Sequence, residues 1–74
     1  MRLDQLAPGQ AAPVLWIRGG RGLVSRLATL GFTPGAIVQM IQNYGHGPLI
    51  VMIRDTRVAL GRGEAAHIVV SMGQ

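Results

Sequence analysis

The sequence predicts a mainly β protein, a small barrel of about five short strands with one short α-helix between the first two. Short apolar stretches rich in β-branched residues recur along the chain, separated by glycine and proline. Only one early stretch has its leucines at helical spacing. The 74 residues can form one domain with a thin core, and closing the sheet into a barrel removes its exposed edges.

The first strand is expected over residues 10–18. Its apolar positions Ala12, Val14 and Ile17 break strict alternation near Leu15, which predicts a β-bulge there. The sequence GGRG follows directly and predicts a turn, because glycine adopts positive φ at little steric cost.

A short amphipathic helix should follow, because Leu23, Leu27 and Leu30 recur at the i, i+4 and i+7 positions of one helical face. Gly31 stands where a left-handed C-terminal cap is expected. Pro34 and the glycine after it suit the central positions of a type II turn, so the helix cannot continue.

The remaining strands are expected over residues 36–43, 48–54, 57–61 and 67–71. The segment 62–66 between the last two predicts a turn or a single helical turn. Together with the first strand, these segments complete the small barrel.

The buried side of the second strand stays open, because the pair Val38 and Met40 and the pair Ile37 and Ile41 are both apolar. From this strand we place Val38 in the expected core. The full expected core is Val14, Leu23, Leu27, Leu30, Val38, Val51, Val58, Leu60, Ile68 and Val70.

Charge and composition narrow the function classes. All seven basic residues are arginine and the net charge is +4, but the arginines are scattered and no aromatic residues alternate with them for base stacking. Without cysteine the chain has neither disulfides nor thiolate metal sites. The longest aliphatic run, 49–53, is far shorter than the ~20 residues of a membrane-spanning helix. A cytoplasmic protein without a signal peptide or membrane insertion is expected.

Little in the chain points to catalysis or metal binding. A nucleophile–base pair would need Ser25 or Ser71 beside His46 or His67, and each of these residues has an ordinary place in a helix, loop or strand. The three acids are spread along the chain, and two histidines without nearby paired acids make a poor site for ferrous iron. We therefore expect no enzyme activity, no catalytic residues, no metal site and no cofactor.

The segments GLVSRLATLGFTPGAIV and GPLIVMIRDTRVALGRGEAAHIVV, in this order and spacing, resemble the FeoA family of small cytosolic proteins of bacterial ferrous iron transport. The resemblance extends from about residue 3 to residue 70. It implies that residues 1–74 form a single FeoA-like domain with an SH3-like barrel. It further implies a non-enzymatic accessory role, with the cytosolic, GTPase-containing part of the FeoB permease as partner.

Two other functions remain open. A small basic barrel could bind nucleic acid, although the scattered arginines do not lead us to expect this. The same barrel also resembles the C-terminal domain of iron-dependent repressors, so the chain could be a stand-alone relative of that domain. The sequence leaves the oligomeric state unknown.

The hypothesis for the partner-binding surface involves five residues. Arg26 and Thr29 lie on the polar side of the expected helix, and Arg21 and Phe32 lie in the turns beside it. Trp16 is the fifth, because exposed tryptophan is enriched at interaction surfaces, although it could instead pack over a barrel end. We expect the glycine–proline corner after the helix to hold this surface in fixed geometry.

Overall fold

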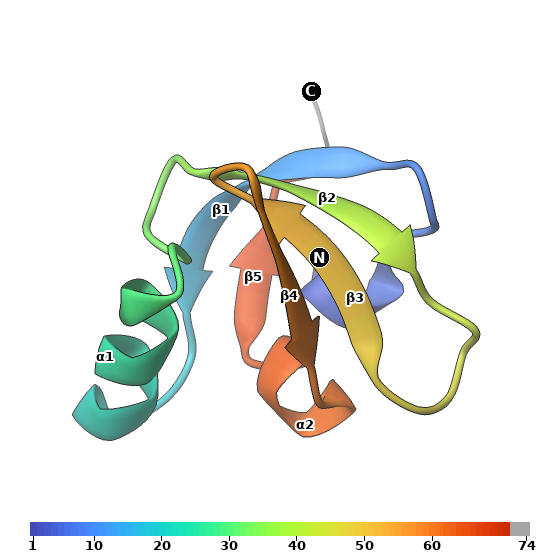
Figure 1. The fold of residues 1–74 in the computed structure, drawn as a ribbon. Coiled ribbons are helices and arrows are strands. Elements are labelled where there is room, and N and C mark those ends of the chain that lie inside the picture. The colour runs from blue at the N-terminus through green and yellow to red at the C-terminus, as the bar shows by residue number, and fades with distance from the viewer. Residues whose placement is uncertain (72–74) are drawn as a thin grey trace.

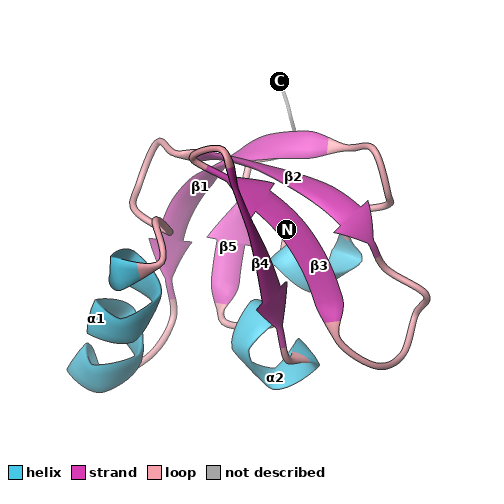
Figure 2. Ribbon diagram, viewed as in Figure 1, coloured by secondary structure: helices cyan, strands magenta, loops and turns pink. Residues whose placement is uncertain are grey.

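Five antiparallel strands form one curved sheet in the computed structural model, which describes residues 1–71 (Figure 1). The strand order across the sheet is β4-β3-β2-β1-β5. Figure 2 shows that strands dominate and that α1 lies between β1 and β2 in the chain, as expected. The elements are η1 (Leu3–Gln5, a 3-10 helix), β1 (Ala11–Ile17), α1 (Arg21–Thr29), β2 (Ile37–Gln42), β3 (Leu49–Ile53), β4 (Thr56–Leu60), α2 (Arg62–Ala65) and β5 (Ile68–Val70).

Bulges bend two of the strands. The bulge expected in β1 is confirmed, because its pairing with β5 shifts register between Val14 and Trp16 and leaves Leu15 as the extra residue. A second shift in β2, between Met40 and Gln42, has no clear signal in the sequence. Bulges increase the local twist, which allows so short a sheet to curl over its own core.

The cap expected after α1 is a complete Schellman motif. Gly31 has φ +108 and donates its N–H to Ala28 O at 2.9 Å, and Phe32 donates its N–H to Leu27 O at 3.0 Å. These two bonds satisfy carbonyls that the end of a helix otherwise leaves without donors.

The type II turn expected after the cap is also present. Ala36 donates its N–H to Thr33 O at 3.0 Å across Pro34 and Gly35, and Gly35 has φ +90. Gly35 also donates its N–H to Val14 O at 2.7 Å. The corner between α1 and β2 is therefore bonded to β1 beside its bulge.

The core lies inside the curved sheet and differs from expectation at four positions. Leu23 and Val58, both expected in the core, are only partly buried and pack against it. Leu30 is 42% exposed, because α1 ends at Thr29 and Leu30 is its C-cap, where the chain leaves the helical stripe. Phe32 was expected to face outward but is fully buried. It is the residue of the Schellman motif that packs toward Leu27 in the last helical turns. The largest fully buried side chains are Phe32, Leu3, Leu27, Met40, Leu49, Ile53, Leu60, Ile68, Val14, Val38, Val51 and Val70.

Candidate interaction surface

The residues expected to face a partner divide between α1 and β1. Arg21, Arg26 and Thr29 are exposed on α1, and Trp16 is 54% exposed on β1, so it does not pack over a barrel end. We call these four residues the helix surface. Phe32 does not belong to it, because its side chain is buried beneath the end of α1.

One residue of the helix surface also makes an ion pair within the protein. Arg26 Nη2 lies 2.8 Å from Glu64 Oε2, which connects α1 to α2 across the molecule. Both side chains are partly exposed, so the pair contributes only about 0–1 kcal/mol to stability. The pair therefore orients the guanidinium more than it stabilises the fold.

Arg26→Glu should lower the free energy of unfolding by up to about 1 kcal/mol, because it places a second carboxylate beside Glu64. The double variant Arg26→Glu with Glu64→Arg should recover most of this loss. Urea denaturation of the unmodified protein, Arg26→Glu, Glu64→Arg and the double variant measures both effects. Arg21→Glu is a charge-matched control that should shift stability by less than about 0.5 kcal/mol. If the loss in the double variant equalled the sum of the losses in Arg26→Glu and Glu64→Arg, the pair would contribute nothing.

A second surface lies on the outer face of the sheet. Gln39 of β2 pairs with Ala11 of β1 and with Met52 of β3, which places three side chains in one row. Pro13 pairs with Ile37 in the next row. Since inward and outward side chains alternate along a strand, these residues all point away from the core.

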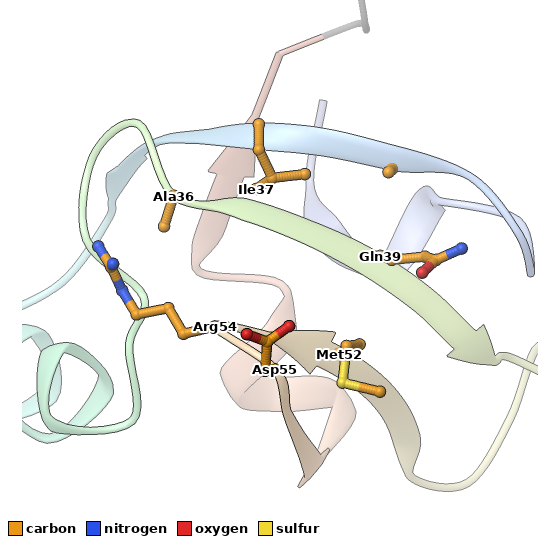
Figure 3. A pocket seen from close by; sticks show the side chains of 7 residues that line it. Ala36, Ile37, Gln39, Met52, Arg54 and Asp55 are labelled. Atoms are coloured by element: carbon orange, nitrogen blue, oxygen red, sulfur yellow. The ribbon is translucent and has the colours of Figure 1, made fainter.

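Between these rows lies an open groove of about 360 Å³ (Figure 3). Ile37, which is 58% exposed, lines its β2 side, and Arg54 and Asp55 of the β3–β4 turn lie at one end. We call it the sheet groove, lined chiefly by Ala11, Ile37, Gln39, Met52, Arg54 and Asp55. A signal for it was present in the sequence, since β2 and β3 are apolar on both faces although the barrel can bury only one.

The turn at the end of the groove has unusual backbone geometry. Arg54 and Asp55 have φ of 49° and 62°, so both central residues of this two-residue hairpin are left-handed without being glycine. Each such residue costs about 1–2 kcal/mol. Arg54 Nη2 donates to Thr33 Oγ1 at 2.9 Å and its Nε donates to Gly31 O at 3.4 Å, so these bonds offset part of the cost. They also hold the turn against the corner after α1.

Neither histidine belongs to the helix surface or the sheet groove. His46 is exposed in the loop between β2 and β3, and His67 Nδ1 lies 2.6 Å from the backbone oxygen of Arg18. Within residues 1–71, no three His, Cys, Asp or Glu side chains are grouped in a way that could hold a metal ion. No helix in the same part of the chain has the length and apolar character needed to cross a membrane.

Comparisons with known proteins agree on one family for this chain. A family model for the FeoA domain matches residues 1–72. The provisionally named Fe(2+) transport protein A of Methanocaldococcus jannaschii is 34% identical over 62 residues, which cover 84% of this chain and 74% of that protein.

Solved structures extend the likeness to the whole fold. An iron uptake regulatory protein, FeoA, is 33% identical with a TM-score of 0.90, over 95% of this chain and 93% of that one. FeoA of Stenotrophomonas maltophilia, solved with zinc and described as a prokaryotic SH3 domain protein, is also 33% identical, with a TM-score of 0.85 over 96% and 89% of the two chains. The expected SH3-like barrel is therefore confirmed.

The expected likeness to the C-terminal domain of iron-dependent repressors is supported for the fold alone. A manganese-dependent transcriptional repressor superposes with a TM-score of 0.83 at 23% identity, over 97% of this chain but only 41% of the repressor. The barrel thus corresponds to part of that larger protein.

Proposed function

The chain belongs to the FeoA domain family, and we propose that it is a non-enzymatic accessory protein of ferrous iron transport that docks on the cytosolic, GTPase-containing part of a FeoB-type permease. The observation that carries this proposal is the family match, which covers residues 1–72. We place the protein in the cytoplasm and take residues 1–74 as one domain. Its role is to bind the permease and thereby support or regulate transport.

The geometry of the helix surface supports a binding role. Trp16 offers apolar contact area and the arginines offer charge, which are the residue types enriched where interfaces are strongest. Gly31 and Gly35 fix the corner that follows α1, so the helix surface is formed before a partner arrives. Such preorganisation favours binding, because fewer groups must be ordered in the complex.

The arrangement of the arginines gives less support to nucleic-acid binding. Four of the seven bond other groups within the described structure: Arg2, Arg26, Arg54 and Arg62. The remaining three are Arg18, Arg21 and Arg57. Three dispersed guanidinium groups provide few of the phosphate contacts on which such binding depends.

Uptake of radioactive ferrous iron by cells that lack the gene for this protein tests the proposal. The intact gene should restore uptake, and a gene encoding Trp16→Ala with Arg21→Glu should restore it several-fold less well, because that variant loses apolar area and charge at the helix surface. Tyr44→Ala is the matched control, since Tyr44 is an exposed aromatic residue at a loop tip away from this surface.

Equal protein levels must be verified by immunoblot in all strains. Uptake that does not depend on the gene at all would contradict the proposed function. Full restoration by the helix-surface variant would contradict only the choice of this surface.

A further inference from the structure

We propose that the sheet groove receives a short extended segment of the partner protein that carries an aliphatic side chain next to a carboxylate. The inference rests on the proposed function, since it names a second contact for the same partner and the chemistry of what fits there.

The apolar character of the outer sheet face is the first line of evidence. Ile37 and Ile41 of β2 are among the exposed large apolar side chains. On β3, Met52 and Ile50, which pair with Gln39 and Gln42, are only partly buried. The outward face of an antiparallel strand is normally polar, because it faces water. An apolar stretch that crosses two neighbouring strands is instead typical of an interaction site.

The size of the groove limits the occupant. Its volume of about 360 Å³ is near the lower end of the range of ~300–1,000 Å³ for binding pockets. It can hold a few side chains of an extended segment but not the face of a folded domain. Gln39 is one of its lining residues, and the side-chain amide can exchange hydrogen bonds with the backbone of such a segment.

The charged residues near one end of the groove determine which charge the bound segment should carry. Arg54 lies at this end, and Arg57 faces outward opposite Met52 on the neighbouring strand. Asp55 is the carboxylate beside them, and none of the three forms an ion pair within residues 1–71. Two positive charges thus lie near one negative charge, and Arg57 is the one whose guanidinium is not already bonded, since Arg54 donates to Thr33 Oγ1 and Gly31 O. An acidic side chain near Arg57 is therefore favoured over a basic one. Arginine binds a carboxylate through two parallel hydrogen bonds.

A second copy of the chain is a poorer occupant. The protein has three acidic residues, of which Asp4 and Glu64 are already paired with Arg2 and Arg26. The third, Asp55, is part of the groove itself. The described surface therefore offers no free carboxylate outside the groove, and the complementary charge must come from a different protein.

Nuclear magnetic resonance of protein with labelled isoleucine and methionine methyl groups tests the proposal. The unlabelled cytosolic part of the permease is added to the full chain. Methyl signals of Ile37 and Met52 should shift or broaden on binding, whereas those of Met40 and Ile68, which are fully buried and lie outside the groove, should change much less.

Affinities of two variants complete the test. Ile37→Thr with Arg57→Glu should weaken binding at least tenfold, because it removes the apolar anchor and reverses the charge that faces the acidic residue. Thr keeps the β-branched shape suited to an exposed strand position, so this variant should fold. Arg18→Glu makes the same change of net charge away from the groove and should weaken binding less than threefold.

Each alternative outcome is distinct. Equal weakening by the Ile37→Thr, Arg57→Glu variant and by Arg18→Glu would show only long-range attraction and would overturn the proposal. If the partner binds but the methyl signals of Ile37 and Met52 do not change, the groove is not a binding site, and the proposed function still stands. If the methyl signals shift with protein concentration in the absence of the partner, the groove binds a second copy of the chain. This outcome would also overturn the proposal. No binding by the unmodified protein would contradict the proposed function and this inference together.

Discussion

Phe32→Ala should lower the free energy of unfolding by about 3–5 kcal/mol, the largest loss expected from any single substitution considered for this protein. The side chain is fully buried, and its backbone N–H closes the Schellman motif on Leu27 O. Truncation removes apolar contact area and leaves a cavity between the end of α1 and the sheet. A 74-residue domain has a total stability of roughly 4–11 kcal/mol, so this variant loses a large fraction of it and should unfold at a much lower temperature.

Thermal and urea denaturation followed by circular dichroism measure this loss. Trp16→Ala is the matched control, because it truncates an aromatic side chain that is 54% exposed and should cost less than about 1 kcal/mol. Similar losses in the two variants would contradict the assignment of Phe32 to the core and of Trp16 to the surface.

Gly31→Val should cost about 2–4 kcal/mol, for two separate reasons. The residue has φ +108, a conformation that a β-branched side chain resists. A Cβ at this position would also lie 3.2 Å from Cδ of Arg54, so the side chain that holds the β3–β4 turn against the corner would have to move. The substitution therefore strains the cap and disturbs the end of the sheet groove at once.

Substitutions at two other glycines separate the backbone strain of Gly31→Val from its steric clash, in the same denaturation assay. Gly35→Val meets no atom within 4 Å but has φ +90, so it reports strain alone. Gly22→Ala lies within α1 without positive φ or close neighbours and should raise stability by about 0.5–1 kcal/mol. If Gly31→Val were as stable as the unmodified protein, the corner would not depend on its left-handed cap.

Local sequence signals predicted most of the fold correctly. The bulge near Leu15, the cap at Gly31 and the turn at Pro34 each follow from residue types within a few positions. The strands follow from short β-branched runs between breaking residues, so their ends are correct to within about two residues. Features that depend on neighbouring residues in the chain are therefore accessible to this kind of prediction.

Tertiary contacts explain what could not be predicted. Leu30 continues the leucine spacing but lies beyond the last helical residue, and Phe32 is buried because the cap turns it back onto the helix. The 3-10 helix at Leu3–Gln5 is too short for any periodic signal, yet Leu3 is fully buried. The sheet groove depends on which residues lie side by side on three strands, and this register is not encoded in any one segment.

The central claim, that this protein binds the permease, is tested most directly by isothermal titration of the full chain with the purified cytosolic part of the FeoB-type permease from the same genome. We predict saturable binding of one partner per chain, which persists at moderate salt and weakens in the Trp16→Ala, Arg21→Glu variant. No heat of binding to the permease, together with tight, steeply salt-dependent binding to duplex DNA, would contradict the account and identify the protein as a nucleic-acid-binding barrel.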